Sequence, residues 1–546
     1  MCSILVHGSA KAQVIPNTAD VSRIKPLQFL ENIASPIPAI RIPNTVNQQP
    51  LTKENAQIPL LLRSVKIEGV TVFSGKELKG VYAPFINKKI LLKDVWAIKD
   101  KLVSLYKEKG YFLATAYIPA QEIDNGTVLI RVIEGHIASV DVPDSMKENR
   151  VVKRLVTKLL EQNPPRLDTL ESFLLRLNDI NGARVFGSIR EVTNPAQEGA
   201  IKLILSEKKE GAQGIYSINN YSSRFLGPWR QQFGYQHSFI PLQRTTISAS
   251  STIPLKELQF GSIVHQIPLS PQWRLQLSTS FAKAAPGFTL TDQDITSNSL
   301  DATVNVSFQP LRQRDENLVF SASISLKDSE SKASDSLLSK DSLRLLSLEA
   351  AYDVTDATDA INSSQLIITK GLDVWGARGR GDADISRAEA SADFTTLQLN
   401  LTREQPINER LSVVTKANGL FADTPLFSSQ EFSYGGATMG RAFDVGEISG
   451  DKGISASLEL QYTSLPYKKF SYTPFIFYDR AKVWNNDTDG RNATAASVGA
   501  GLRLGHDSGL GIKSTLAQPL LRRIDTPRFG NSGKNPVLLV EFGIRF

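Results

Sequence analysis

The chain has 546 residues, too many for one ordinary soluble domain, and its 62 lysines and arginines against 55 aspartates and glutamates leave a net charge of +7 that is spread along the sequence. No block of basic residues marks a nucleic-acid surface, so nucleic acid is not an expected partner. The single cysteine, Cys2, excludes an internal disulfide framework and a cysteine-based zinc site, and the five scattered histidines show no ligand spacing. The composition therefore predicts neither a metal nor another cofactor.

The N-terminal part of the sequence shows three features of different kinds. Residues 1–12, "MCSILVHGSAKA", end in the small-x-small pattern of a secretory signal, but their apolar part is short and no basic residue precedes it. We interpret them as a residual signal segment; an ordinary N-terminal tail is the alternative. Residues 13–35 carry apolar side chains at three-residue steps between 18 and 33, which predicts a short helix weakened by Pro26. Prolines recur through residues 36–62 and indicate an extended linker.

The next part of the chain predicts two copies of one small α+β unit. In residues 63–136, "SVKIEGV" is typical of a strand, "LKDVWAIKDKLVSLYKEKG" carries the apolar stripe of a helix, and "YFLATAYIP" and "TVLIRVIEG" alternate as strands. Residues 137–210 repeat the pattern with a strand, two helices and two closing strands. Two copies of about 75 residues each indicate a tandem array rather than a single enzyme core.

Beyond residue 210 helical periodicity gives way to short alternating segments. In "FTTLQLNLT", for example, Leu397 and Leu399 point to one side of a strand and Gln398 points to the other. About 335 residues accommodate sixteen strands of about 10 residues each, an even number that closes without an edge. The sequence therefore predicts a mainly β chain in which residues 211–546 form a 16-stranded antiparallel transmembrane β-barrel; a soluble sandwich is the alternative.

The connections between these segments alternate between short and long. The long connections are predicted at residues 284–298, 328–340, 373–390 and 423–452. No run of about 18 apolar residues is present that would form a membrane-spanning helix. Short turns on one side and long loops on the other are typical of outer-membrane barrels, as is a last strand that ends in an aromatic residue, here Phe546.

Several stretches resemble a known family. They are "GYFLATAYIPAQEIDNGTVLIRVIEGHI" in the first α+β unit, "LRLNDINGARVFGSI" in the second, and two motifs in the barrel region. The chain is similar to the outer-membrane transporters of two-partner secretion, the TpsB type of the haemolysin secretion/activation family, which export haemolysins, filamentous adhesins and contact-dependent toxins. The resemblance covers nearly the whole chain and implies a plug helix, two POTRA-like domains in the periplasm and a barrel in the outer membrane of a Gram-negative bacterium. It also implies a secreted exoprotein partner, bound through its secretion domain, and contact with outer-membrane lipid and lipopolysaccharide.

One of the barrel motifs lies in a glycine-rich loop, "GGATMGRAFDVG", at residues 435–446. It resembles the family's loop motif Val-Arg-Gly-aromatic, here "GRAFD", with Ala442 in place of the glycine. Its candidate site residues are Gly435, Gly436, Gly440, Arg441 and Phe443. A loop of about 30 residues that folds back into a wide, wet barrel loses much conformational entropy, so we expect a bidentate contact between arginine and a carboxylate to hold its tip.

The second barrel motif, "FYDRA", supplies the expected carboxylate. It resembles the family pattern Phe-x-Asp-x-Gly through Phe477 and Asp479, with Ala481 in place of the glycine. Strand alternation places these three residues on one face and Tyr478 on the other, which would be the lipid face. We predict that Arg441 contacts Asp479 and positions the loop during export; a solvated loop arginine is the alternative.

The predicted function is export of a large partner exoprotein from the periplasm to the cell surface. No phosphate-binding loop is present, so transport is expected to proceed without ATP, after strand addition of the exoprotein to the POTRA-like units. The alternative is a factor of the same superfamily that assembles other outer-membrane proteins. An enzyme is not expected, because no arrangement of Ser, His and Asp is evident. Residues 485–490, "NNDTDG", resemble the start of a calcium loop, but Ala496 stands where the bidentate glutamate belongs.

Overall fold

The computed structural model describes residues 15–24, 53–180, 183–192, 198–209, 211–464, 469–486, 492–521 and 535–546. The chain forms two compact units: one comprises residues 1–31, 211–311 and 315–546, and the other comprises residues 32–210 and 312–314. The predicted residual signal segment, residues 1–12, and residues 36–52 of the predicted linker lie outside the described residues.

The smaller unit begins with an α+β domain. Its elements are α1 (Lys53–Ala56), β1 (Pro59–Leu62), β2 (Ser64–Glu68), α2 (Gly75–Tyr82), η3 (Ala83–Phe85), β3 (Lys88–Leu91), α3 (Leu92–Glu108), β4 (Thr115–Tyr117), η4 (Asp124–Gly126) and β5 (Thr127–Ile133). The middle strand of its sheet, β5, runs parallel to β2 and antiparallel to β4. Strand β1 pairs with β3 and buries Leu62, so residues 59–62 belong to this domain and the linker predicted over 36–62 is wrong there.

Helix α3 supplies the core of this domain through the apolar stripe that the sequence shows. It buries Val95, Ile98, Leu102 and Tyr106. The helix begins where Asp94 accepts a hydrogen bond from the backbone N–H of Leu91 at 2.8 Å, which satisfies one of the free donors of the first turn.

The second α+β domain of this unit repeats the arrangement. Its elements are β6 (His136–Asp141), α4 (Arg150–Leu160), α5 (Leu167–Ile180), β7 (Ala183–Glu191) and β8 (Ala200–Lys209). The middle strand β8 runs parallel to β6 and antiparallel to β7. Helix α4 begins at Asn149, whose side chain accepts hydrogen bonds from the backbone N–H groups of Val151 and Val152 at 2.8 and 3.2 Å. Both domains therefore have a three-stranded sheet with two edge strands among the described strands.

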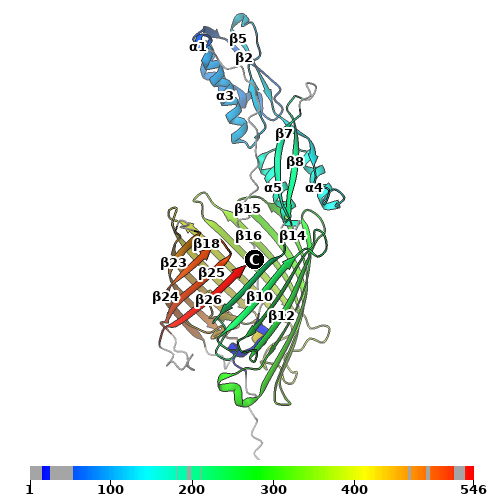
Figure 1. Cartoon of the computed structure of the whole chain (residues 1–546), viewed down its shortest axis with the longest axis vertical. Helices are drawn as coiled ribbons and strands as arrows, with labels where there is room; N and C mark the ends of the chain where they lie inside the picture. The colour runs from blue at the N-terminus through cyan, green and yellow to red at the C-terminus, as the bar shows by residue number, and fades with distance from the viewer. Residues whose placement is uncertain are drawn as a thin grey trace, which may run out of the picture. The chain divides into compact units, whose positions relative to one another are not determined.

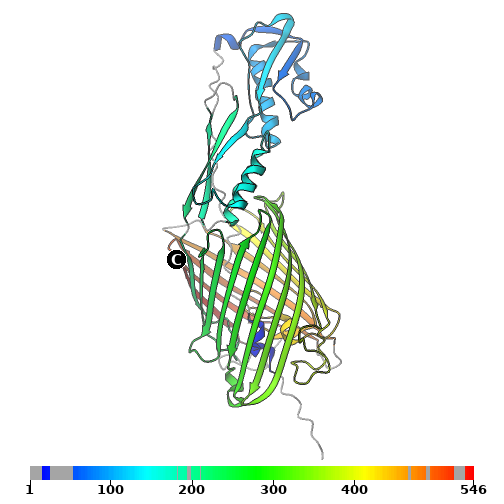
Figure 2. The ribbon, with the colours of Figure 1, turned by 90° about the vertical axis from the view of Figure 1, so that its right-hand side faces the viewer.

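The larger unit is a closed antiparallel barrel of sixteen strands. Figures 1 and 2 show the barrel from two sides. The strands are β9 (Gln213–Asn219), β10 (Arg230–His237), β11 (Arg244–Thr252), β12 (Leu258–Pro268), β13 (Trp273–Ala284), β14 (Ile295–Arg312), β15 (Glu316–Ala333), β16 (Ser336–Thr355), β17 (Ile361–Gly371), β18 (Thr395–Pro406), β19 (Leu411–Ala422), β22 (Lys452–Tyr462), β23 (Phe470–Trp484), β24 (Ala493–His506), β25 (Leu510–Pro519) and β26 (Val537–Arg545). The last strand closes the barrel by pairing with the first, with Phe542 opposite Ile218. The predicted 16-stranded antiparallel barrel is confirmed.

The two faces of the barrel differ as the alternation predicts. On β18, Leu397, Leu399 and Leu401 are 46%, 42% and 39% exposed on the outer surface. Buried polar side chains alternate with outward apolar ones on other strands, as at Ser248 and Ser262, whose hydroxyls lie 2.6 Å apart. An apolar outside and a polar inside suit a barrel surrounded by lipid. No helix of the described residues is long and apolar enough to cross a membrane.

One predicted connection is wrong. Residues 328–340 were expected to form a long loop, but strands β15 and β16 continue through most of this range and turn at Ser334 and Asp335. The alternation of "KDSESKA" is hydrophilic on both faces, which is typical of strands that extend beyond the lipid, and polarity alone did not distinguish such strands from a loop. The connections at residues 372–394 and 423–451 are long, as predicted.

The described N-terminal residues lie inside the barrel and are dark blue in Figures 1 and 2. They form two 3-10 turns, η1 (Asn17–Ala19) and η2 (Val21–Arg23). The predicted plug helix at 13–35 is therefore wrong over residues 15–24, and residues 13–14 and 25–35 lie outside the described ones. The reason is local: Asp20 is extended between the turns, and its carboxylate accepts the backbone N–H of Ser22 at 2.9 Å, which starts a new turn instead of continuing a helix.

A carboxylate in the first α+β domain joins three of its segments. Glu134 accepts hydrogen bonds from the backbone N–H groups of Thr71 and Val72 at 2.8 and 3.2 Å and from the Tyr106 hydroxyl at 2.7 Å. Partial burial raises the pKa of Glu134, but these hydrogen bonds, together with one from the Thr71 hydroxyl, outweigh that effect and hold the pKa below its ordinary value.

This lowered pKa predicts a pH dependence of stability. A folded-state pKa below the unfolded value stabilises the domain above the unfolded pKa of about 4.3, and the contribution is lost as the pH falls through the folded-state pKa. We expect Glu134→Gln to make the unfolding temperature of residues 53–210 less dependent on pH between 7 and 3, as measured by circular dichroism. An identical pH profile for the variant and the unaltered protein would contradict this assignment.

Candidate functional site

The connection between β19 and β22 folds back into a compact hairpin. Its base is formed by β20 (Phe432–Tyr434) and β21 (Ile448–Gly450), which pair antiparallel. Backbone hydrogen bonds close its tip, from Gly436 N–H to the carbonyl of Phe443 at 2.9 Å and from Phe443 N–H to the carbonyl of Gly440 at 2.8 Å. The glycine-rich motif singled out from the sequence is therefore the tip of this hairpin.

Three glycines give the tip its path. Gly435, Gly436 and Gly440 have φ angles of +125°, +107° and +77°, which residues with a side chain rarely adopt. A Cβ atom on Gly435 would lie 1.9 Å from the carbonyl oxygen of Asp444, and one on Gly440 would lie 2.8 Å from the ring of Tyr434. The tip can thus be this tight only with glycine at these positions.

The structure brings Arg441 and Asp479 together. The Nε atom of Arg441 lies 3.3 Å from Oδ2 of Asp479, in a pair whose side chains are 4% and 0% exposed. The same Oδ2 accepts the backbone N–H groups of Gly440 at 3.0 Å and Arg441 at 3.3 Å. The carboxylate on β23 therefore holds the main chain of the loop as well as its guanidinium. The Ser457 hydroxyl donates to Oδ1 at 2.6 Å.

Two further contacts of the guanidinium were not predicted. Arg441 Nη1 lies 2.5 Å from Oε2 of Glu459 on β22, and the guanidinium carbon lies 3.9 Å from the ring centroid of Phe477. Glu459 also pairs with Arg503 on β24 at 2.5 Å. Alternation in "GISASLELQY" places Glu459 on the inward face, so a charged residue in the inward series was the signal available in the sequence.

The remaining predicted residues pack around this pair. Phe443 and Phe477 are 1% and 3% exposed in one apolar cluster with the two alanines, Ala442 and Ala481, that depart from the family pattern. Both alanines are fully enclosed, so their methyl groups fill space in the cluster and leave the Arg441 contacts intact. The pair of charges thus lies in an aromatic, water-poor environment, where electrostatic attraction is strengthened.

A second set of charges holds the tip on its other side. Arg224, in the connection between β9 and β10, places Nε 2.6 Å from Oδ2 of Asp444 and Nη2 2.5 Å from Glu447. Its backbone N–H also donates to Asp444 at 3.1 Å. The tip is therefore fixed to two parts of the barrel that lie far apart in the sequence.

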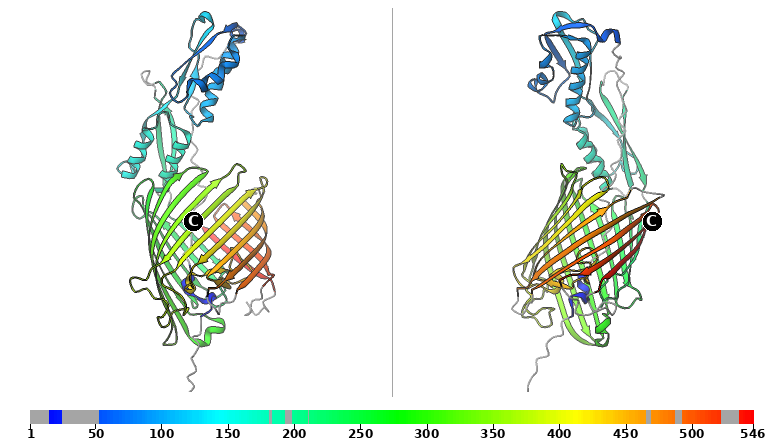
Figure 3. Two further views of the ribbon diagram at one scale, coloured as in Figure 1. Left: turned by 180° about the vertical axis from the view of Figure 1, so that it is seen from behind. Right: turned by 90° about the vertical axis from the view of Figure 1, so that its left-hand side faces the viewer.

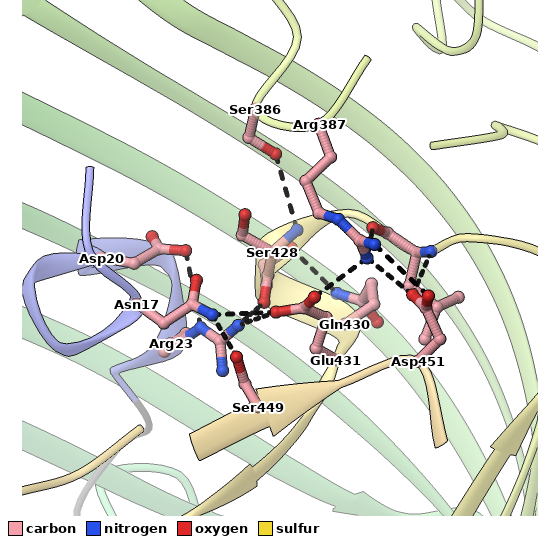
Figure 4. A network of polar contacts seen from close by, with 12 residues as sticks. Asn17, Asp20, Arg23, Ser386, Arg387, Ser428, Gln430, Glu431, Ser449 and Asp451 are labelled. Carbon is pink, nitrogen blue, oxygen red and sulfur yellow. Dashed lines mark hydrogen bonds and ion pairs between the residues drawn. The ribbon is translucent and has the colours of Figure 1, made fainter. Parts of the chain in front are cut away.

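The N-terminal segment is attached to the base of the same loop. Arg23 places Nη2 2.8 Å from Oε2 of Glu431 and donates to the carbonyl of Ser428, as Figure 4 shows. The Asn17 side-chain amide donates to the same Oε2 at 3.0 Å. The contact is partly apolar as well, because Val21 packs against a buried cluster of the barrel wall.

Glu431 also connects this loop to another one. Its Oε1 lies 2.9 Å from Arg387, in the connection between β17 and β18, and Arg387 pairs with Asp451 at 2.6 Å (Figure 4). Asp451 in turn accepts the backbone N–H of Leu426 at 2.7 Å. None of these residues was singled out from the sequence, because charged residues in loops carry no periodic signal.

The charged side chains of this region contact other segments of the chain. Among the described residues, no group of three or more His, Cys, Asp or Glu side chains could hold a metal ion. The carboxylates named above are instead occupied by arginines and backbone N–H groups. Residues 487–490 of the calcium-like stretch lie outside the described residues.

The steric role of Gly435 leads to a testable prediction. Gly435→Ala should open the tip, because the new methyl group overlaps the carbonyl of Asp444, and trypsin should then cleave after Arg441. Gly419→Ala is the matched control: its Cβ would find its nearest neighbour at 3.9 Å, on β19 next to the same loop. Limited proteolysis of the folded barrel measures this. Equal protection of Arg441 in both variants would refute the role assigned to the glycine.

Comparison with known proteins identifies the family. The model of the haemolysin secretion/activation protein ShlB/FhaC/HecB matches residues 258–504, and that of the ShlB-type POTRA domain matches residues 60–135. The heme/hemopexin transporter protein HuxB of Haemophilus influenzae is 22% identical over 486 residues, which cover 82% of this chain and 81% of the relative. The outer membrane transporter CdiB of Escherichia coli is 20% identical over 493 residues, which cover 85% and 80%.

Solved structures share the fold. CdiB from Escherichia coli matches with a TM-score of 0.70 at 16% identity, covering 93% of this chain and 94% of that chain. BamA from Haemophilus ducreyi lacking POTRA domains 1–3 matches with a TM-score of 0.53 at 14% identity, covering 89% and 100%. The predicted recognition is confirmed, and the barrel lies in the outer membrane with the POTRA domains in the periplasm. The chain belongs to the ShlB/FhaC/HecB family of haemolysin secretion/activation proteins, the outer-membrane transporters of two-partner secretion.

Proposed function

We propose that this transporter exports one large exoprotein, a haemolysin, an adhesin or a contact-dependent toxin, and binds its secretion domain through the POTRA domains before threading it through the barrel. The observation that carries the proposal is that two segments of the chain lie inside the barrel, the hairpin at 423–451 and the N-terminal residues 15–24. Ion pairs and hydrogen bonds attach both segments to their surroundings, together with apolar contacts such as those of Phe443 and Val21. Such contacts can be exchanged for contacts with a passing chain.

The interaction energies of these contacts are compatible with reversible release of the N-terminal segment from the barrel interior. Two charges 4 Å apart attract with about 4 kcal/mol at an effective dielectric constant near 20, and a hydrogen bond to a charged group contributes about 1.5–3 kcal/mol net. The polar contacts of the N-terminal segment with the barrel and the loop include those of Arg23 with Glu431 and the carbonyl of Ser428, those of Asn17 with Glu431 and Ser449, and that of the Thr18 carbonyl with the Ser223 hydroxyl. An incoming polypeptide could displace it without ATP. This segment acts as a plug in the proposal, although it is not the continuous helix expected.

Substrate binding in the periplasm is assigned to strand edges. Within the domains proposed at residues 63–136 and 137–210, the edge strands of the three-stranded sheets are β2 and β4 in the first and β6 and β7 in the second. An extended exoprotein segment could add to such an edge through main-chain hydrogen bonds, which tolerate many sequences. β7 (Ala183–Glu191) has nine residues and is the longest of the four.

Arg441 and Asp479 are assigned a positioning role in export, with Phe443, Phe477 and the three tip glycines shaping their surroundings. The proposal includes no catalytic step. The proposal also includes outer-membrane lipid and lipopolysaccharide as partners, in contact with the outward apolar face of the barrel. Assembly of other outer-membrane proteins is the competing function. A pull-down with residues 53–210 as bait distinguishes the two functions. Capture of one exoprotein supports export, and capture of many barrel precursors supports assembly.

The positioning role predicts the effect of Arg441→Ala. The substitution leaves Asp479 and Glu459 buried without the guanidinium, which destabilises the tip by about 3–5 kcal/mol. We expect export of the exoprotein to fall at least tenfold while the barrel still assembles, as shown by its heat-modifiable migration on gels. Arg410→Ala, in the exposed turn between β18 and β19, is the control. Unchanged export in the Arg441 variant would remove the role.

The plug role predicts a change in conductance. Arg23→Ala removes the ion pair with Glu431, so the N-terminal segment should leave the interior more often and channel openings in planar bilayers should become more frequent. Arg23→Lys preserves the charge and should behave like the unaltered protein. The same opening frequency for the alanine variant and the unaltered protein would show that this contact does not hold the segment.

A further inference from the structure

Three basic side chains lie together on the outward face of the barrel. On β23, Arg480 and Lys482 are exposed and alternate with the buried Asp479. Lys452 on β22 pairs in register with Trp484, which makes it the diagonal neighbour of Lys482. Alternate residues on one strand face are about 7 Å apart, and diagonal neighbours on adjacent strands are about 7–8 Å apart. We call Lys452, Arg480 and Lys482 the basic patch.

The position of the basic patch along the strand matches the upper boundary of the lipid. The outward residues before it on β23 are Phe470, Tyr472, Pro474, Ile476 and Tyr478. From Phe470 to Tyr478 there are eight steps of about 3.4 Å, which on a strand tilted by about 40° rise roughly 20 Å, close to the apolar band of about 25 Å. The basic patch therefore begins where the lipid headgroups begin.

The same end of β23 identifies the leaflet. It adjoins the ends of β19 and β22 that carry the long connection at 423–451, and long loops of such barrels lie on the extracellular side. The right-hand view of Figure 3 looks onto the orange strands of this part of the barrel. The basic patch therefore faces the outer leaflet.

Several other basic side chains on this rim have acidic partners. Lys332 and Lys340 both pair with Glu330, at 2.7 and 3.7 Å, and Lys370 pairs with Asp393. Arg344 pairs likewise with Asp328 at 3.0 Å.

The basic patch is different, because within the described ranges none of its three members has a carboxylate within ion-pair distance. Aromatic rings take that place: Lys452 lies 4.7 Å from the ring centroid of Phe421, and Lys482 lies 4.9 Å from that of Trp484. In both contacts the ammonium nitrogen lies over the ring, so a cation–π interaction holds the charged end of each lysine at this level of the barrel. Three neighbouring cations at this level of the barrel attract the anionic groups of the lipid surface.

We propose that the basic patch binds the phosphate groups of lipid A, the membrane anchor of lipopolysaccharide in the outer leaflet. The guanidinium of Arg480 offers a planar pair of donors that matches phosphate oxygens, and the two lysines supply further positive charge on the same face. The inference deepens the lipid contact of the proposed function and does not depend on export.

The experiment measures lipid A binding to the full-length protein in a neutral detergent by native mass spectrometry. The test variant is Lys452→Gln/Arg480→Gln/Lys482→Gln. The control variant, Lys283→Gln/Lys340→Gln/Lys370→Gln, removes the same charge from other strands of the barrel. Each basic residue near an anionic lipid surface contributes about fivefold to affinity, so we expect the test variant to bind bisphosphorylated lipid A about a hundredfold more weakly and the control to retain its affinity.

Dephosphorylated lipid A distinguishes phosphate recognition from binding of the acyl chains, and heat-modifiable migration verifies that each variant is folded. If the triple variant does not fold, the single variant Arg480→Gln, with an expected loss of about fivefold, decides the question. Equal affinity of the unaltered protein for phosphorylated and dephosphorylated lipid A, or equal loss in test and control variants, would overturn the proposal. Export is measured in parallel: lost lipid A binding with normal export supports this site independently, whereas normal binding with lost export concerns only the proposed function.

Discussion

Arg441 lies between two carboxylates of the barrel wall where water is excluded, and the arrangement of the rest of the interior depends on this contact. Removing a guanidinium and a carboxylate from water costs several kcal/mol per ion, and the cost is offset only if all partners are in place. Here Asp479 receives the main chain and side chain of the loop and Glu459 is shared with Arg503, whereas Nε of Arg441 lies near Asp479 without a hydrogen bond. The loop therefore has one well-defined position, and a shift would leave charges buried without partners.

The other charges of the interior follow the same logic on a smaller scale. Asp444 and Glu447 divide Arg224 between them, and Glu431 accepts Arg23 on one oxygen and Arg387 on the other. Each contact joins segments that are distant in the sequence. A barrel with a polar inner face offers less apolar surface than a soluble core, so discrete charge contacts provide the specificity that packing provides elsewhere.

The regular alternation of apolar and polar residues along the strands made the barrel predictable from the sequence. The contacts of the loops were predictable only where a sequence motif marked the residues involved. On β18, Leu397 and Leu399 identify the outward face. On β23, alternation puts Phe477 and Asp479 on the inward face and Tyr478 on the outward face. Asp479 could be predicted as the partner of Arg441 because both residues lie in recognisable sequence motifs. Arg224 and Arg387 were missed because they lie in loops, whose contacts depend on three-dimensional closure and leave no periodic trace, whereas Glu459 was missed although strand alternation placed it on the inward face. The helix expected near residue 20 failed because Asp20 competes locally for the backbone.

A double-mutant cycle on Arg441→Ala and Asp479→Ala tests the central claim most directly, with the free energy of opening the tip measured from the rate of proteolysis within residues 435–447. If the two side chains hold the loop through each other, the double variant will open little more easily than the worse single variant, with a coupling of about 1–3 kcal/mol. Additive effects of the two substitutions, within about 0.5 kcal/mol, would mean that the pair does not hold the loop.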